Sequence, residues 1–511
     1  MRDLTSRLTN YFKASFPAIA IQTTEEQRAV SEVWSAAQAC KRKLVTWSAT
    51  EGMRELSGDS YQEIPDTEDL VAACKQRIKD AILIFRDVQT WPFDRDPILS
   101  RAMRELMQWA PTEGSGVVLI GPEIKPHPTM EKLIVVLDYT LPSPDDLRRV
   151  ADGVAKSARK ELKADDDVIR ALSGLSTPEA ENALALSLVE RKVFDPSIIY
   201  REKVQAVRKS GLLDIIEADP RGLDSIGGLE ELKVWINRRK RAYSQEAKDF
   251  GLPAPKGVLM VGVPGTGKSL SAKAIGTALG IPTLRWDIGS AFNSLVGESE
   301  SRTRDTLELA TALAPCVLWI DEIDKGLAGA SGSGSGDSGV TRRVFGTVIS
   351  WMQERTAPVF VVATANQVEG LPPEVLRKGR FDEIFAIDLP RDDERAAIFA
   401  IHLKRLKRDA VTVDDDLISA TDGFTGSEIE CLIYEGLFKA FEQGRELKTA
   451  DMIDAAEATT PLSITAKEQI ASIRKWAETR ARFASARSSQ SNIKSVRRFS
   501  SVGEDFDRAS L

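Results

Sequence analysis

The sequence predicts an α/β fold with mostly parallel sheets, arranged as two successive modules. Three observations support this prediction. Short apolar runs alternate with stretches of helical periodicity, one run leads directly into a glycine-rich segment, and another ends in a pair of carboxylates. Strands that alternate with helices form βαβ units and therefore a parallel sheet. Because ligands of such sheets bind at the carboxyl ends of the strands, we expect a functional site at that edge.

The first half of the chain contains five apolar runs that predict buried strands. Helical patterns separate them, for example at residues 25–40 and 97–109. The expected strands are 18–22, 43–47, 81–87, 116–121 and 133–138.

The second half repeats this plan. In both halves the fifth strand continues into a proline-containing turn and an amphipathic helix. We interpret the repetition as an internal duplication; the alternative is that any two five-stranded α/β modules look alike at this level. The expected strands of the second half are 257–261, 282–287, 316–321, 358–363 and 384–388.

A phosphate-binding loop is predicted between the strand at 257–261 and the helix that follows it. Residues 262–269 read GVPGTGKS and match the pattern G-x-x-x-x-G-K-[ST]. The glycines let the backbone turn so that successive N–H groups point at phosphate oxygens. Lys268 is expected to reach the β- and γ-phosphates of ATP, and the Ser269 hydroxyl to ligate Mg²⁺. The predicted ATP-binding residues of this segment are Gly262, Val263, Pro264, Gly265, Thr266, Gly267, Lys268, Ser269 and Leu270.

Two carboxylates end the apolar run that begins at Cys316. Asp321 is expected to join Ser269 in holding Mg²⁺, and Glu322 to orient and deprotonate the attacking water. The alternative is a pair of solvated acids at a strand end, which the upstream glycine-rich loop argues against.

The first half lacks this chemistry. Its first strand is followed by TTEEQRAV, without glycine or lysine, and Asp87 is followed by Val88 rather than by a second acid. Without backbone N–H groups to cradle phosphates, this half is not expected to bind nucleotide tightly. We therefore expect it to have a scaffold, docking or regulatory role.

Composition limits the remaining possibilities. The 511-residue chain has a net charge of −7, which argues against broad coating of nucleic acid. Its four cysteines lack C-x-x-C spacing and it has two histidines, so we expect reduced thiols, an intracellular compartment and no zinc site. No apolar run approaches the ~20 residues of a membrane span, and we expect no stable membrane insertion.

Residues 220–460 resemble the AAA+ ATPases in several spaced motifs. Beyond the loop and the acid pair, these motifs are DSIGGL at 224–229, VVATAN at 361–366, LRKGRFD at 376–382 and GFTGSEIE at 423–430. The resemblance implies Mg²⁺-dependent ATP hydrolysis by a five-stranded parallel sheet with a helical lid. With the degenerate first half and the segments LVGESE and PLSIT, the chain is similar over residues 1–480 to the conserved AAA ATPases of red-algal plastids, cyanobacteria and other bacteria. This similarity implies a cytoplasmic location, or the plastid stroma if the chain is plastid-encoded.

The resemblance also implies roles for individual residues. Arg377 and Arg380 would act as arginine fingers in the ATP site of a neighbouring subunit, where they would offset charge on the transferred phosphoryl group. Asn366 would contact the γ-phosphate or the attacking water. The residues implied to lie near the adenine and the ribose are Ile226, Gly227, His402, Gly426 and Ser427.

One motif departs from the family pattern. Many protein-threading members carry an aromatic–hydrophobic–glycine pore loop, whereas this position reads Leu295-Val296-Gly297 and Phe292 lies three residues early. The motif therefore does not support threading of a polypeptide. The Gly/Ser-rich segment at 326–339 has Asp337 as its one charged residue, which does not favour a grip on nucleic acid.

The motifs divide the chain into five expected regions. They are a degenerate, nucleotide-free AAA-like α/β domain at 1–164, a helical lid or linker at 165–220, a large AAA+ ATPase subdomain at 221–390, a helical lid at 391–480, and a disordered tail rich in Ser and Arg at 481–511.

Three functional hypotheses follow. The leading one is a ring-forming ATPase, expected to be a hexamer, that remodels or disassembles a protein partner; fingers supplied by a neighbour require a heterologous interface, and such interfaces close into rings. The second is a slow ATP-dependent switch or scaffold whose inactive first module recruits a client. The third is a nucleic-acid motor, which the acidic balance counts against. The sequence does not identify the client.

Overall fold

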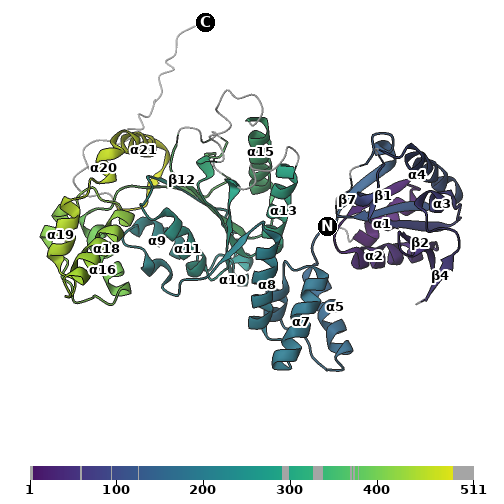
Figure 1. Ribbon diagram of the computed structural model, residues 1–511, viewed down its shortest axis with the longest axis horizontal. Coiled ribbons are helices and arrows are strands. Elements are labelled where there is room, and N and C mark those ends of the chain that lie inside the picture. The colour runs from purple at the N-terminus through teal and green to yellow at the C-terminus, as the bar shows by residue number, and fades with distance from the viewer. Residues whose placement is uncertain are drawn as a thin grey trace, which may run out of the picture. The chain divides into compact units, whose positions relative to one another are not determined.

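The structure is a computed structural model, and it describes residues 4–57, 60–93, 95–122, 124, 126–289, 298–325, 338–368, 371, 374–377 and 379–486 (Figure 1). The pore-loop position at 295–297 and residues 326–337 of the Gly/Ser-rich segment lie outside these ranges. The chain divides into two compact units, Met1–Ala206 and Val207–Leu511. The five domain bounds expected from the sequence stay a prediction.

The first unit contains a seven-stranded sheet in the order β4-β3-β2-β5-β6-β1-β7. The five strands expected from the sequence are present and parallel to one another. The strands β3 and β4, which were not expected, pair antiparallel and extend the edge at β2. The strands are β1 Ala18–Gln22, β2 Lys43–Ser48, β3 Gly52–Ser57, β4 Ser60–Ile64, β5 Ala81–Arg86, β6 Gly116–Gly121 and β7 Ile134–Asp138.

Helices cover both faces of this sheet (Figure 1). Successive residues of a strand point to opposite faces. Ile19 and Ile21 of β1 therefore pack with α1 and α2, whereas Ala18 and Ala20 pack with α3 and α4. These helices are α1 Leu4–Lys13, α2 Glu26–Ala39, α3 Leu70–Lys75 and α4 Pro97–Trp109.

Four further helices surround a separate apolar core, and the last of them ends four residues beyond the boundary of the first unit. Two of them begin at capping boxes, in which the Asp146 carboxylate accepts from the Ser143 N–H and the Glu179 carboxylate from the Ser176 N–H. The helices are α5 Pro144–Ser157, α6 Asp166–Leu172, α7 Thr177–Arg191 and α8 Pro196–Ser210.

The second unit also contains a seven-stranded sheet, in the order β14-β13-β9-β12-β11-β10-β8. It includes all five strands expected in this half, extended by the short strands β8 and β14 at its edges. The strands are β8 Asp214–Ile216, β9 Gly257–Gly262, β10 Thr283–Trp286, β11 Cys316–Ile320, β12 Val359–Ala365, β13 Glu383–Ile387 and β14 Arg482–Phe483.

The two sheets share one connectivity. When the five expected strands of each half are counted in chain order, both sheets run fifth, first, fourth, third, second. A shared order of five strands is much more specific than a shared α/β class, and it supports the duplication expected from the sequence.

Helices of the second unit form a covering layer and a separate bundle. α9 and α11 pack on one face of the sheet, and α16 to α19 enclose their own apolar core as the lid. The helices are α9 Glu230–Asn237, α10 Gln245–Asp249, α11 Lys268–Leu279, α13 Glu298–Ala312, α15 Ser338–Glu354, α16 Asp392–Arg405, α17 Asp415–Ala420, α18 Gly426–Glu442, α19 Thr449–Glu457, α20 Leu462–Thr465 and α21 Lys467–Arg480.

The start of the expected disordered tail is ordered, which corrects the prediction for residues 481–486. β14 pairs with β13, and Ala484 is fully buried while its carbonyl accepts from the N–H groups of Glu231 and Leu232. These backbone hydrogen bonds extend the sheet edge and outweigh the polar composition of the segment. Residues 487–511 lie outside the described part of the chain.

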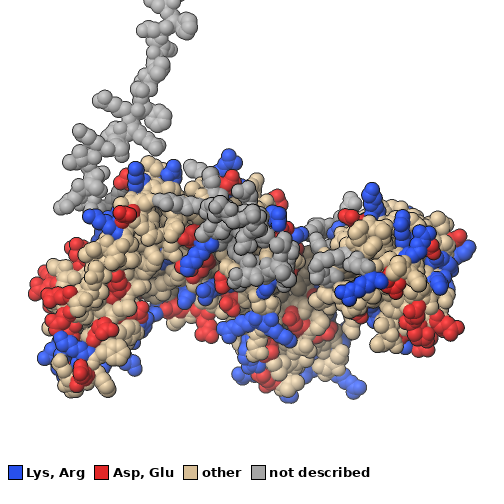
Figure 2. Space-filling view, turned by 45° about the horizontal axis from the view of Figure 1, so that its top comes forward, with Lys and Arg blue, Asp and Glu red and all other residues tan. Residues whose placement is uncertain are grey.

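Two features bear on the predicted absence of membrane and nucleic-acid partners: the character of the helices and the distribution of charge on the surface. None of the helices in the described part of the chain combines the length and apolar character that crossing a bilayer requires. On the face drawn in Figure 2, basic and acidic side chains lie among one another.

Candidate functional site

The loop between β9 and α11 has the backbone of a phosphate cradle. Gly265 and Gly267 have φ angles of 79° and 91°, in the left-handed region where other residues are strained. Gly262 is required for another reason, since a Cβ there would lie 2.2 Å from the carbonyl oxygen of Ile387. α11 begins directly after this loop at Lys268, so the positive end of the helix dipole faces the same space.

Lys268 is buried at the base of the loop, with 6% of its surface exposed. Its Nζ donates to the carbonyl oxygens of Gly262, at 2.6 Å, and Val263, at 2.7 Å. Burial lowers the pKa of this lysine to about 8, although the neighbouring carboxylates favour its charged form. The ammonium is therefore held close to the glycine-rich backbone and is only partly stabilised by it.

Ser269, Asp321 and Thr364 form a cluster at the carboxyl end of the sheet. Asp321 Oδ1 lies 3.4 Å from the Ser269 hydroxyl and accepts from Thr364 Oγ1 at 2.7 Å. The Thr364 hydroxyl in turn accepts from the N–H of Glu322 at 2.9 Å. Glu322 has a left-handed φ of 49°, which turns the chain out of β11 directly after Asp321. Thr364 lies within VVATAN, but its contact with Asp321 could not be predicted from the sequence, because only the sheet brings β12 beside β11.

Asn366 lies within hydrogen-bonding distance of the second acid. Its Nδ2 donates to Glu322 Oε1 at 2.9 Å, and Lys325 Nζ lies 2.6 Å from Oε2 of the same carboxylate. The N–H groups of Asn366 and Gln367 both donate to Asp324 Oδ2 at 3.1 Å. Asp324 is partly buried, which raises its pKa, and it fixes the backbone that carries the Asn366 amide.

A cavity of about 370 Å³ joins the loop, the acids and the lid. This volume lies within the range of small-molecule sites. Most of the residues predicted from the sequence line it: Ile226, Gly227, Pro264, Gly265, Thr266, Gly267, Lys268, Ser269, Leu270, Asp321, Glu322, Asn366, His402, Gly426 and Ser427. Further lining residues, to which the motifs assigned no role, are Ser225, Thr364, Ile398, Ile401, Arg405 and Glu430. The predicted residues Gly262 and Val263 are not part of the lining.

Lid residues close one side of this cavity. The Ser427 N–H, at the start of α18, donates to the carbonyl oxygen of Gly265 at 3.1 Å. Gly227 packs so tightly on α16 that a Cβ would lie 2.5 Å from Cγ1 of Ile398. His402 is mostly buried, which lowers its pKa, and its Nδ1 lies 3.7 Å from Glu430 Oε1. The imidazole is therefore neutral at pH 7 and presents an uncharged ring to the cavity.

The two predicted finger arginines lie apart from this cavity lining. Arg377 is exposed, and Arg380 is half-buried with its guanidinium donating to the carbonyl of Glu374. Within the described ranges, no three His, Cys, Asp or Glu side chains gather to hold a metal by themselves. One carboxylate and one hydroxyl beside a phosphate cradle nevertheless fit Mg²⁺, which proteins often bind together with substrate phosphates.

Comparisons with known proteins identify the family. The family model "ATPase family associated with various cellular activities (AAA)" matches residues 258–389. Models of the N-terminal and second domains of SpoVK-like AAA ATPases match residues 4–139 and 145–210.

Relatives match most of the chain. The AAA domain-containing protein ycf46 of Guillardia theta is 36% identical over 475 residues, covering 91% of this chain and 93% of that protein. Its counterpart in Pyropia yezoensis is 35% identical over 493 residues, covering 94% and 99%. The proteasome-activating nucleotidase of Sulfurisphaera tokodaii is 34% identical over 268 residues, covering 50% and 66%. With its phosphate cradle and acid pair in place, the chain belongs to the AAA family of ATPases and is an enzyme that hydrolyses ATP.

Proposed function

We propose that the chain is a Mg²⁺-dependent ATPase that works as a hexameric ring and remodels or disassembles a protein partner. The observation that carries this proposal is the position of Arg377 and Arg380 outside the lining of the chain's own cavity, while the other expected site residues except Gly262 and Val263 lie on it. Arginines that act on a neighbour's site require a head-to-tail interface, and repeated head-to-tail interfaces close into rings. The proposed location is the cytoplasm, or the plastid stroma if the chain is plastid-encoded.

In this proposal the loop binds the phosphates and the acids serve the chemistry. Lys268 and the loop N–H groups contact the β- and γ-phosphates, and Ser269 and Asp321 would hold Mg²⁺, which neutralises charge on the phosphates when bound. Glu322 accepts a proton from the attacking water. Asn366, which already bonds the Glu322 carboxylate, orients that water or the γ-phosphate.

The remaining cavity residues bind the nucleoside. Ile226 and Gly227 border the adenine on one side, and His402 presents its neutral ring from α16. Gly426 and Ser427 approach the ribose from the start of α18. The contact between Ser427 and Gly265 supports this role, because it couples the lid to the loop that holds the phosphates.

A slow regulatory switch is the second candidate. It is favoured by the first unit, in which the loop after β1 lacks the glycines of the phosphate cradle. In this version ATP controls assembly, and the first unit recruits the client.

One experiment separates the candidates. Glu322→Gln should bind ATP without consuming it, so its mass in solution is measured with ATP, with ADP and without nucleotide. A hexamer with ATP that also retains a protein client, together with client-stimulated turnover of the native chain, supports remodelling. Assembly that follows ATP over ADP without stimulation supports the switch. A monomer at saturating ATP contradicts both, and Lys268→Ala serves as the control without nucleotide.

A further inference from the structure

The correspondence between the two units extends into their helical bundles. α7 and α18 both follow a glycine in the left-handed region, Gly174 with φ 86° and Gly423 with φ 77°. Both also begin at an equivalent cap, in which Glu179 accepts from the N–H of Ser176 and Glu428 from that of Thr425. The bundle α5 to α8 is therefore the lid of the first unit, as α16 to α19 is the lid of the second.

The two lids contact their sheets in different ways. In the second unit, the backbone at the start of α18 bonds the glycine-rich loop. In the first unit, the start of α7 contacts the loop after β1 through side chains, since Thr177 Oγ1 donates to Glu25 Oε2 at 3.0 Å. The Glu25 side chain is 5% exposed, so a carboxylate is buried at this junction.

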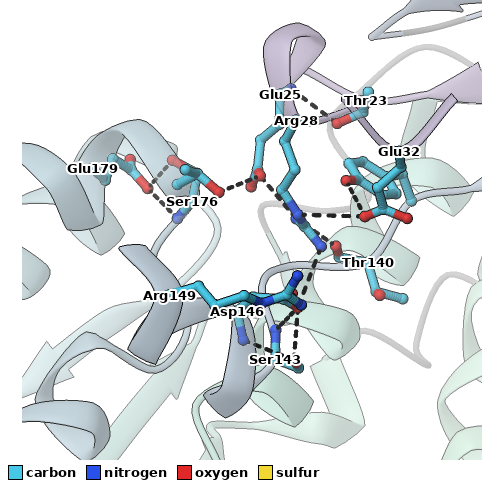
Figure 3. Close-up of polar contacts among 12 residues, drawn as sticks. Thr23, Glu25, Arg28, Glu32, Thr140, Ser143, Asp146, Arg149, Ser176 and Glu179 are labelled. Atoms are coloured by element: carbon cyan, nitrogen blue, oxygen red, sulfur yellow. Dashed lines mark hydrogen bonds and ion pairs between the residues drawn. The ribbon is translucent and has the colours of Figure 1, made fainter. Parts of the chain in front are cut away.

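Arg28 of α2 is the centre of this junction (Figure 3). Its guanidinium donates to Glu25 Oε2 at 2.8 Å and to the carbonyl oxygen of Thr140, which precedes α5, at 3.1 Å. It also lies 3.9 Å from Asp146 on α5 and 3.9 Å from Glu32 on α2. Arg28, on a helix that covers the sheet, thus contacts both the connection into the lid and the first lid helix, α5. It also contacts the Glu25 carboxylate, which bonds the third lid helix, α7.

An aromatic ring supports this cation from the same connection. The Arg28 guanidinium carbon lies 4.3 Å from the ring centroid of Tyr139, whose hydroxyl donates to Glu32 Oε1 at 2.7 Å. The planar guanidinium therefore has a stacking partner as well as carboxylate acceptors, a combination that Lys would not reproduce.

Charges at the loop and strand ends are also inverted between the units. α11 begins at the cation Lys268, whereas α2 begins at the anion Glu26. In each sheet, the third parallel strand is followed by a residue with a left-handed φ. This residue is Asp87, with φ 59°, in the first unit and Glu322, with φ 49°, in the second. The residue before it is basic in the first unit, Arg86, and acidic in the second, Asp321. Arg86 lies 2.9 Å from Glu26, so the first unit closes an internal ion pair at this edge.

We propose that these side chains take the place of a ligand in the first unit and hold its lid on its sheet permanently. We call the three residues Glu25, Arg28 and Thr177 the lock. Glu25 is buried and is stabilised by its two partners, so the junction loses its compensation when either partner is removed. The first unit therefore keeps one conformation whatever nucleotide the second unit holds. This inference concerns the first unit alone and goes beyond the proposed ring and remodelling activity.

Hydrogen exchange of the full-length chain tests the lock. In the native chain, exchange of the backbone at 139–147 and in the first turn of α7 should be slow and equal with and without ATP. Arg28→Met keeps an apolar stem but removes the charge, and should speed exchange in both segments about 100-fold. Arg54→Met is the matched control. Arg54 also bonds two carboxylates, Glu51 at 2.8 Å and Glu63 at 3.0 Å, but in the hairpin, so exchange in the lid should not change.

A milder variant covers the case in which Arg28→Met does not fold. Thr177→Val removes one hydroxyl and should speed exchange in the first turn of α7 up to about tenfold. Unchanged exchange in Thr177→Val and in any folded Arg28 variant would overturn the lock, as would a change in native lid exchange when ATP is added. Because the readout is independent of turnover, its result is separate from the fate of the proposed function.

Discussion

Thr364 connects to Asp321 by a hydroxyl that donates to Oδ1 at 2.7 Å, and the same hydroxyl accepts from the N–H of Glu322 at 2.9 Å. One buried side chain on β12 thus fixes both the proposed metal ligand and the backbone of the proposed base. The contact matters because Glu322 has a left-handed φ that its side chain does not favour. We therefore expect Thr364 to position the acid pair for hydrolysis.

Thr364→Val should lower the turnover of ATP about 10- to 100-fold. Valine has nearly the same shape but neither donates nor accepts, and a hydrogen bond to a charged group contributes about 1.5–3 kcal/mol. ATP affinity should change little, because the phosphate cradle is not altered. Steady-state kinetics over a Mg²⁺ titration measure the effect, and the apparent Mg²⁺ affinity should also fall.

Thr364→Ser is the matched control for this prediction. Serine keeps the hydroxyl and should restore most of the turnover and the Mg²⁺ affinity. If Thr364→Ser is impaired while Thr364→Val is not, the methyl packing of Thr364 is what matters, and the positioning role is wrong.

ATP affinity should depend on pH through Lys268. Burial holds the pKa of this lysine at about 8 in the free protein, and phosphate contact favours its charged form. Below about pH 8 the charge is already present and the ATP dissociation constant should be flat. Above about pH 8, Lys268 must take up a proton when ATP binds. The dissociation constant should therefore rise by about tenfold per pH unit until the pH reaches the pKa that Lys268 has in the ATP-bound state.

The measurement is a series of ATP titrations between about pH 7 and about pH 9.5, a range that brackets this pKa. Lys268→Arg keeps its charge throughout and should bind more weakly but with a flat profile. A flat profile for the native chain would show that Lys268 is not the titrating contact.

The sequence predicted the parallel strands because each is a short apolar run with helical spacing on either side. The hairpin strand β4 was not predicted, because its residues are mostly exposed and polar and backbone pairing with β3 holds it in place. β14 was missed for the same reason, because composition carries no information about pairing with a distant strand.

The phosphate loop and the acids were predictable because each is a contiguous motif. Thr364 and Arg405 were not. Thr364 lies within VVATAN, but nothing in that motif shows that its hydroxyl contacts Asp321, and Arg405 belongs to no motif; only the fold brings β12 and α16 to the cavity. The lock in the first unit was hidden for a similar reason. TTEEQRAV indicates the loss of phosphate chemistry, but the partners of Glu25 and Arg28 come from the lid, more than a hundred residues away.

Glu322→Gln should separate ATP binding from hydrolysis. The amide keeps the shape of the side chain but cannot take a proton from water, and general-base catalysis contributes about 100-fold or more. We expect near-native ATP affinity with turnover reduced at least about 100-fold, measured by phosphate release. Lys325→Gln is the control, because its exposed ammonium contacts the same carboxylate and should alter turnover only slightly. Native turnover in Glu322→Gln would require a different base.

Arg377→Ala and Arg380→Ala each test whether these arginines act in the ATP site of a neighbouring subunit. Loss of an arginine finger is expected to lower turnover by ~10³-fold or more while ATP still binds. Mixing Arg380→Ala chains with Lys268→Ala chains should restore part of the hydrolysis, because some interfaces then join an intact cradle to an intact finger. Turnover that stays at the level of the separate variants, in mixtures shown to assemble together, would exclude action between neighbours.

The full-length chain should bind one ATP. In the second unit the cradle has left-handed glycines, a buried lysine and the positive end of α11, whereas α2 of the first unit begins with Glu26 after the buried Glu25. Carboxylates at this helix end repel phosphate where the second unit attracts it. Calorimetry should therefore give one site for Glu322→Gln, which prevents consumption of ATP during the titration. The same titration on full-length Lys268→Ala should give none at micromolar concentrations, with the melting temperature as the check on folding. A tight site that survives in Lys268→Ala would place nucleotide in the first unit and contradict its description as a degenerate copy.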